Sequence, residues 1–188
     1  MRKLYTPIAV VLLLLAGAVS ADPAQPVWSA GAPQAAAPAG APVQTYTSTD
    51  GRFSVLFPGT PKLEAQPIHL KNGETTTLYE FEFSADDDKA SYIVMYNDYA
   101  ADVIAGAPDA LLQRTEAGAV VGKTLLTETA IDLHGVPGRA YTAKDSDGYN
   151  YDVHEFLSGT RFYQLIITTA KGDSATHRDL FMNSFSIL

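Results

Sequence analysis

The sequence contains no cysteine among its 188 residues. Disulfides, thiol nucleophiles and thiolate metal sites are therefore excluded, and a folded form must rely on a hydrophobic core. The four histidines, His69, His134, His154 and His177, are spread along the chain without a close pair. That spacing is not typical of a zinc or iron site. We therefore expect no metal and no other cofactor.

Basic residues are scarce and scattered. Lys and Arg total 13 against 21 Asp and Glu, and the formal net charge is -8 at pH 7. Nucleic-acid binding depends on basic patches that displace counterions from phosphates. No run of Lys and Arg follows Lys3. Nucleic acid is therefore not an expected partner.

No cluster of residues typical of an enzyme stands out. Ser174, His177 and Asp179 are the residue types of a catalytic triad, but they fall within one expected helix, on which Asp179 points elsewhere. The segment DSDGYNYD, residues 145–152, has the carboxylates and glycine of a calcium loop, yet its glycine comes fourth instead of sixth. A tight hairpin turn explains that segment better. We therefore predict that the protein is not an enzyme.

The N-terminus has the pattern of a secretory signal peptide. Arg2 and Lys3 precede an apolar run from Ile8 to Val19, and small residues close the segment at Ala21. Twelve helical residues span about 18 Å, short of the roughly 30 Å hydrocarbon core, so no stable membrane span is expected. Cleavage after Ala21 gives a periplasmic or secreted chain whose net charge moves from -8 to -10. Retention of residues 1–21 as an uncleaved anchor is the alternative.

Residues 22–45 form an Ala/Pro-rich segment with one aromatic residue and one charged residue. Frequent proline prevents regular helix and sheet pairing and favours extended conformers, which predicts a disordered linker. From residue 46 to residue 188, apolar and aromatic residues recur without another such break. This stretch is expected to form a single domain.

Periodicity within this domain predicts an α+β fold, with a central antiparallel sheet flanked by two main helices. The helices are expected over Asp109–Val121 and within residues 171–185, where Asp173 or Ser174 would cap the helix and Leu180, Phe181 and Phe185 would be buried. The expected strands lie near Tyr46 and over Phe53–Phe57, Leu63–Leu70, Thr75–Ser84, Ser91–Tyr99, Thr124–Leu133, Arg139–Lys144, Tyr149–Leu157 and Arg161–Thr169.

Two of these strands carry further information about their place in the sheet. Ser91–Tyr99 has apolar residues on both faces, which predicts a strand in the middle of the sheet. Phe53–Phe57 runs directly into Pro58, and proline has no amide hydrogen for a sheet ladder. That pattern predicts an edge strand followed by a fixed corner at Gly59 and Pro61.

The order of several motifs along the chain is similar to that in a known family. The stretch YTSTDGRFSVLFPGTPKL, a hairpin, the strand YIVMYNDY, a helix, and then GVPGRAY, FLSGTRFYQLIIT and FMNSFSIL resemble small exported bacterial domains related to the PsbP superfamily. The resemblance covers about residues 46–188. It implies a PsbP-like antiparallel sheet flanked by helices and a non-enzymatic accessory, assembly or binding role. Nothing in the chain matches a photosystem-binding motif, so no site residues are transferred.

Polar residues alternate with apolar ones along three expected strands, so each polar set lies on one side of its strand. If those sides share one sheet face, that face is acidic and forms the expected partner or ligand surface. Its residues are Glu80, Glu82, Glu128, Asp132, Asn150, Asp152 and His154.

These features together predict an exported, non-enzymatic accessory or binding domain that acts through an unknown protein or cell-envelope partner. Two alternatives remain open. Paired carboxylates on the acidic face would suit a hydrolase or a metal-assisted enzyme. A gap between sheet and helices would suit the carriage of a small apolar ligand.

Overall fold

The computed structural model describes residues 43–69, 73, 75–85, 89–104 and 108–188. The predicted signal peptide, residues 1–21, and most of the predicted linker lie outside this described part. The linker was expected to reach residue 45, but strand β1 (Gln44–Ser48) already includes its last two residues. None of the helices in the described ranges has the length and apolar character needed to cross a membrane.

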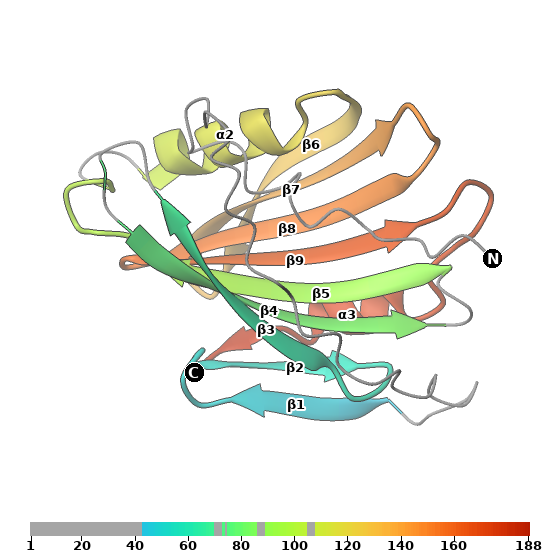
Figure 1. Ribbon diagram of the computed structural model, residues 1–188, viewed down its shortest axis with the longest axis horizontal. Helices are drawn as coiled ribbons and strands as arrows, with labels where there is room; N and C mark the ends of the chain where they lie inside the picture. Colours follow the sequence, from blue (N-terminus) through green and yellow to red (C-terminus); the bar gives the residue numbers. More distant parts are fainter. Residues whose placement is uncertain (1–42, 70–72, 74, 86–88, 105–107) are drawn as a thin grey trace, which may run out of the picture.

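The described residues form two antiparallel sheets, whereas the sequence predicted one. The larger sheet has seven strands in the order β3-β4-β5-β9-β8-β7-β6 and is the central layer in Figure 1. The smaller has the order β1-β2-β10. Besides β1, the strands are β2 (Phe53–Phe57), β3 (Lys62–His69), β4 (Thr75–Ala85), β5 (Ala90–Asp98), β6 (Lys123–Leu133), β7 (Val136–Asp145), β8 (Asn150–Ser158), β9 (Arg161–Thr169) and β10 (Ser186–Ile187).

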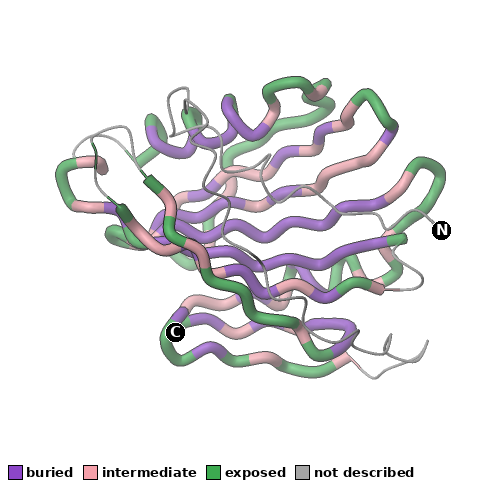
Figure 2. Tube along the Cα trace, in the orientation of Figure 1, coloured by how far each residue is buried: buried purple, intermediate pink, exposed green. Residues whose placement is uncertain are grey.

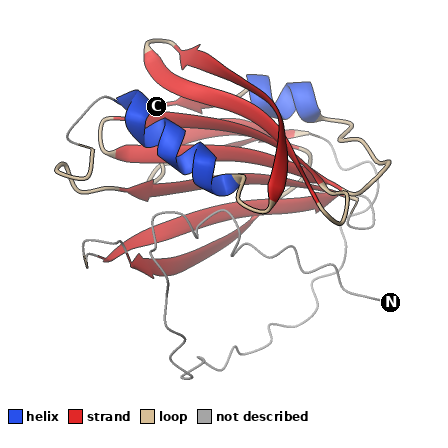
Figure 3. Cartoon of the chain, turned by 90° about the horizontal axis from the view of Figure 1, so that it is seen from above, coloured by secondary structure: helices blue, strands red, loops and turns tan. Residues whose placement is uncertain are grey.

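The two helices of the described part lie on opposite faces of the larger sheet. Helix α2 (Pro108–Ala119) contacts β7 and β8 on one face, and Figure 3 shows it lying across the strands. Helix α3 (Arg178–Asn183) lies on the other face together with the small sheet. The predicted α+β class is therefore right, but two main flanking helices are only partly matched. The second face is covered by strands as well as by a helix of six residues.

Helix α3 also begins later than the sequence predicted. Its N-cap is His177, which makes no capping hydrogen bond with its side chain, so neither Asp173 nor Ser174 caps it. Phe181 is buried as predicted, but Leu180 is 40% exposed. A helix of under two turns buries only a narrow stripe, and Leu180 lies outside that stripe.

The main hydrophobic core lies between the two sheets. Phe53 of β2 is fully buried, and its ring centroid lies 5.3 Å from that of Phe81 on β4 and 6.5 Å from that of Tyr163 on β9. Phe185, which follows α3, closes the cluster with a centroid 5.8 Å from that of Phe53. Aromatic contacts of this kind stabilise beyond the apolar area that they bury. Phe53 therefore joins both sheets and the C-terminal segment.

The prediction that Phe53–Phe57 is an edge strand is wrong. β2 is the middle strand of the small sheet, because β1 pairs with it on one side and Ser186 and Ile187 of β10 pair on the other. The Ser184 hydroxyl also accepts a hydrogen bond from the Leu56 amide at 2.8 Å. Pro58 does end the strand, as expected.

The central placement of Ser91–Tyr99 is confirmed. β5 lies between β4 and β9, and its first eight residues are all buried. Figure 2 shows this burial along the middle strands, whereas β6 at the rim is mostly exposed. The four consecutive strands β6 to β9 also form the predicted antiparallel meander.

Truncating Phe53 tests whether the aromatic cluster holds the two sheets together. Phe53→Ala is expected to lower the free energy of unfolding by about 3–5 kcal/mol, because it leaves a cavity among well-packed rings. Leu63→Ala on β3, where the leucine is 53% exposed, should change it by less than about 0.5 kcal/mol. Urea unfolding of both variants measures the difference. Similar losses in the two variants would contradict the role of Phe53.

Candidate functional site

The structure does not place the seven predicted site residues on one sheet face, so the expectation of a single acidic face is corrected. Side chains alternate between faces along each strand. Leu78 of β4 packs with Ala119 of α2, so Glu80 and Glu82 share the α2 face. Phe156 of β8 packs in the core on the α3 side, so the predicted site residues on the same side of β8 share the α3 face. Those residues are Asn150, Asp152 and His154.

The four predicted acids on the α2 face fall into two groups that lie far apart. Glu128 and Asp132 pair with Tyr141 and Pro137 of β7, which places them on the outermost strand β6. Strand β4 is five strand steps away, or roughly 24 Å at about 4.8 Å per step. Two separate acidic groups therefore replace the predicted common surface.

Glu80 is almost fully buried in β4, directly across from Glu64 of β3. Burial, followed by the nearby charges of Glu82 and Glu64, raises its pKa to about 7. Lys62 pairs with Glu64 at this rim, and its charge partly offsets that rise. These three glutamates form an acidic group near one sheet edge, and Lys62 compensates its charge in part.

The β8 residues on the α3 face have local partners. Asp152 forms an ion pair with Arg178 of α3. His154 is half-buried, and that burial lowers its pKa below the usual value, so its ring is neutral at pH 7. Asp152 thus links β8 to α3, the His154 ring lies 6.4 Å from that of Phe156, and neither side chain meets the acids of the opposite face.

The segment DSDGYNYD forms the predicted hairpin turn between β7 and β8. Asp145 Oδ1 accepts hydrogen bonds from the amides of Asp147 at 3.0 Å and Tyr149 at 2.9 Å. Its Oδ2 accepts another from the Tyr151 hydroxyl at 2.9 Å. The carboxylate thus serves the turn itself. Within the described ranges, no group of three or more His, Cys, Asp or Glu side chains is placed to hold a metal ion.

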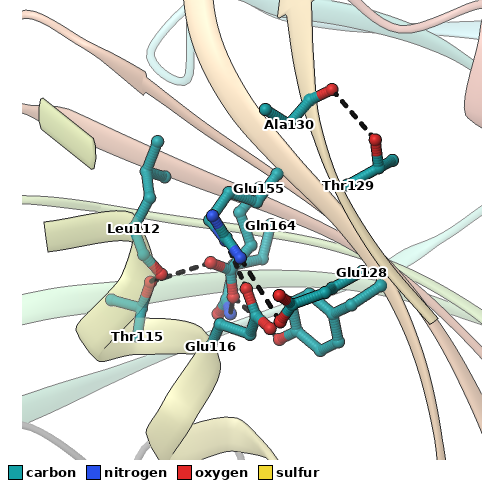
Figure 4. Close-up of polar contacts among 10 residues, drawn as sticks. Leu112, Thr115, Glu116, Glu128, Thr129, Ala130, Glu155 and Gln164 are labelled. Atoms are coloured by element: carbon teal, nitrogen blue, oxygen red, sulfur yellow. Dashed lines mark hydrogen bonds and ion pairs between the residues drawn. The ribbon is translucent and has the colours of Figure 1, made fainter. Parts of the chain in front are cut away.

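The most unusual polar group of the described chain lies beneath α2 and is centred on Glu155 of β8. Its side chain is fully buried. The Tyr141 hydroxyl and the Gln164 amide each donate to Oε1 at 2.8 Å, and the Thr115 hydroxyl of α2 lies 2.8 Å from Oε2 (Figure 4). Three strands and one helix therefore meet at a single carboxyl group.

Burial shifts this carboxyl group toward its protonated form. Burial raises the pKa of Glu155 to about 7, although the hydrogen bonds from Thr115, Tyr141 and Gln164 act in the opposite direction. Thr115 Oγ1 also lies 2.8 Å from the Leu112 carbonyl oxygen. A hydroxyl has one hydrogen, so it cannot donate to both acceptors. If Glu155 donates its proton to Thr115, the Thr115 hydrogen is free for Leu112 and every contact is used.

A charged cluster continues from this buried group to the surface. Glu116 of α2 pairs with Arg139 of β7, and Arg139 Nη2 lies 3.5 Å from Glu128 Oε2 on β6. Burial raises the pKa of Glu116, and a contact with Glu128 adds to that rise, whereas Arg139 lowers it. One arginine thus serves two glutamates, which leaves acidic charge at the β6 edge. Glu116 and Glu128 lie close together in Figure 4.

Sequence reasoning identified Glu128 but missed Glu155, Glu116 and Arg139. On β8 it favoured the polar side of the strand, whereas Glu155 lies between the apolar Val153 and Leu157 on the opposite side. A lone glutamate within an apolar face was the available signal, since buried acids require partners.

An open pocket of about 310 Å³ lies at one end of the larger sheet, near the start of α2. Most of its lining is apolar or glycine: Ile104, Pro108, Gly135, Val136, Pro137, Leu157, Ser158 and Gly159. None of the predicted site residues lines this pocket, and Glu155 is not part of it.

The fold has a counterpart among solved structures. The solution structure of a cyanobacterial PsbP from Synechocystis sp. matches 87% of this chain and 100% of that chain, with a TM-score of 0.51 and 16% identity. The chain has a PsbP-like fold. At this level of identity the match shows the fold and not the function.

Two further solved structures are more loosely similar. One, from Bacteroides thetaiotaomicron, has a TM-score of 0.39 and 13% identity and covers 78% of this chain and 48% of that chain. The other, a protein of unknown function from Pseudomonas aeruginosa, has a TM-score of 0.32 and 11% identity, with coverages of 72% and 88%. No protein-family model and no curated protein matches the sequence.

The raised pKa of Glu155 predicts a pH-dependent stability. In the unfolded chain a glutamate titrates near pH 4.5, and in the folded protein this one titrates near 7. Between these values the folded state holds the extra proton, so its contribution to stability falls as pH rises and levels off above about 7. Over the whole interval the loss is up to about 3 kcal/mol.

Glu155→Gln isolates this effect, because the amide can donate to Thr115 and accept from Tyr141 and Gln164 without titrating. The free energy of unfolding of the variant, relative to that of the natural protein, should rise from pH 5 to pH 8, as measured by urea unfolding. Replacement of exposed Glu64 by Gln should change stability by less than about 1 kcal/mol at either pH. Parallel pH profiles for the natural protein and Glu155→Gln would show that Glu155 is already ionised at pH 5.

Proposed function

We propose that the protein is an exported, non-enzymatic accessory domain that binds a protein or cell-envelope partner. The observation that carries this proposal is the burial of Glu155. Two carboxyl groups of the described residues have a pKa raised to about 7. Glu155 is fully buried beneath α2 and bonded to protein groups, and Glu80 is almost fully buried in β4. A general acid or base must come within hydrogen-bond reach of its substrate.

The distribution of the other acids supports the same proposal. Glu80 and Glu82 lie near one edge of the larger sheet, and Glu128 and Asp132 lie at the other. Retaining and inverting glycosidases need two carboxyl groups within about 10 Å of each other on either side of one bond. A hydrolase that draws on both acidic groups is therefore disfavoured.

The exposed surface offers a binding element in place of a reactive one. Strand β6 has 11 residues, of which eight are exposed and three are partly buried. Glu128 and Asp132, both predicted as surface residues for a partner or ligand, lie on this strand. Export is inferred from the pattern of residues 1–21, which matches a secretory signal peptide.

Carriage of a small apolar ligand is a second candidate, favoured by the pocket near the start of α2. Its volume of about 310 Å³ is at the lower end of the range for small-molecule sites. Native mass spectrometry of the protein purified from its source compartment would reveal a retained ligand. Replacing Leu157 by Trp should then remove that ligand, because the larger side chain would fill part of the pocket.

Export makes a direct prediction about the mature N-terminus. Mass spectrometry of the protein recovered from the periplasm or medium should find Asp22 as the first residue, since cleavage is expected after Ala21. Replacement of Ala21 by a bulky residue such as Phe should slow this processing. Recovery of most of the protein with residues 2–21 attached would contradict cleavage.

Photo-cross-linking in intact cells tests the binding role. A photoreactive residue would be placed at Ala130 on β6, Ala65 on β3 or Leu180 on α3, all of which are exposed. We expect one envelope or exported protein to be enriched at one or two of these positions and to be absent at the rest. Equal recovery of abundant proteins from all three positions would contradict an accessory role.

A further inference from the structure

The outer edge of β6 is open along most of its length. Within the described residues, β6 pairs with β7 alone and ends the larger sheet. An irregularity between Leu125 and Thr127 interrupts the pairing, but the seven residues from Thr127 to Leu133 follow β7 without a break. In an antiparallel sheet, alternate residues direct their N–H and C=O groups outward. This stretch therefore offers unpaired backbone groups to another strand.

The opposite edge of the same sheet is protected. β3 has eight residues and contains Pro67, which has no amide hydrogen, together with the exposed pair Lys62 and Glu64. Proline and charge are common ways to prevent pairing at a sheet edge. The regular part of β6 has neither proline nor lysine. Its only lysine, Lys123, precedes the irregularity and donates to the Ala119 carbonyl at 2.7 Å.

The charges along β6 indicate what kind of strand would fit. Glu128 and Asp132 project on the α2 face, four residues apart, with the small side chain of Ala130 between them. The Glu128 side chain is 54% exposed and Arg139 is shared with Glu116, so its charge is only partly offset. Asp132 Oδ1 accepts a hydrogen bond from the Gly135 amide at 2.7 Å. An incoming strand with Lys or Arg opposite both acids would complement them.

The other face of β6 favours β-branched or apolar partners. Thr127, Thr129 and Ile131 alternate with the acids and project on the α3 side of the sheet. Cross-strand pairs between β-branched residues stabilise a sheet. A fitting segment thus alternates basic and β-branched residues, with its two basic positions four apart.

Two other occupants fit less well. In a symmetric antiparallel pair of β6 strands centred on Ala130, Glu128 of each copy lies opposite Asp132 of the other, and like charges directly opposite destabilise a sheet. The chain's own segment from residue 22 to residue 42 contains no Lys or Arg and is rich in proline. It cannot supply the complementary charge.

We propose that β6 receives an extended, basic segment of another protein as an added strand at the edge of the larger sheet. This inference rests on the proposed binding function and specifies the chemistry of the partner. Backbone hydrogen bonds to residues 127–133 provide the pairing, and basic side chains opposite Glu128 and Asp132 set the register.

The test uses the purified full chain and the peptide Thr-Lys-Val-Thr-Val-Lys-Thr, followed by NMR of the backbone amides. The peptide should shift the amides of residues 127–133 and slow their hydrogen exchange. A peptide with Glu at both Lys positions should bind about tenfold more weakly. In the double variant Glu128→Lys, Asp132→Lys, this preference should reverse in favour of the Glu peptide.

Backbone methylation of the peptide separates strand addition from simple charge attraction. Two versions of the Lys peptide carry N-methyl groups on alternate residues, one version on the odd positions and one on the even positions. Only one set of amides can face β6, so one version should lose binding and the other should retain it. This comparison uses the unaltered protein, so a folding defect in a variant cannot mimic the result.

Three outcomes would overturn the inference. They are the absence of shifts at residues 127–133, equal binding of both methylated peptides, and an edge already protected from exchange in a dimer or by the chain's own N-terminal segment. If cross-linking still finds one partner at Ala65 or Leu180, the proposed binding function survives and only the β6 inference fails. If no position yields an enriched partner, the binding function fails as well.

Discussion

The structure depends on the packing of aromatic side chains between its two sheets. Phe53 contacts rings from both sheets and from the C-terminal segment, and it is fully buried. A small sheet of three strands cannot bury its apolar face alone, so it is stable only against the larger one. Without cysteine, no covalent link can replace this contact. The same packing fixes which face of the larger sheet remains available to α2.

The α2 face of the larger sheet differs from this aromatic core, because it contains a buried acid. Desolvation outweighs three hydrogen bonds at Glu155 and raises its pKa to about 7. The Thr115 hydroxyl of α2 lies 2.8 Å from this carboxyl group, and the contact links the helix to the strands below. Arg139 and Glu116 continue this polar contact toward β6, where the Glu128 side chain is 54% exposed.

Much of the fold could be predicted from the sequence, because local periodicity reports burial directly. Alternation along Phe53–Phe57, two-sided apolarity in β5 and helical spacing in α2 all correspond to the observed burial. The split into two sheets could not be read from these patterns. The middle position of β2 could not be read from them either, because it depends on residues 186–187, which pair with β2 from the opposite end of the domain. The candidate site was harder to predict. The polar pattern of a strand shows which residues share one side of that strand, but not which sides of different strands form the same sheet face.

The sequence by itself determined the acidic character, the absence of thiol chemistry, the α+β class and most strand and helix positions. These follow from composition and from interactions among residues close in the chain. Only the tertiary structure decided that β2 is a central strand, that Glu155 lies beneath α2, and that β6 forms an open edge. Each of these depends on which distant strands become neighbours, and strand order is set by packing of the whole domain and not by local periodicity.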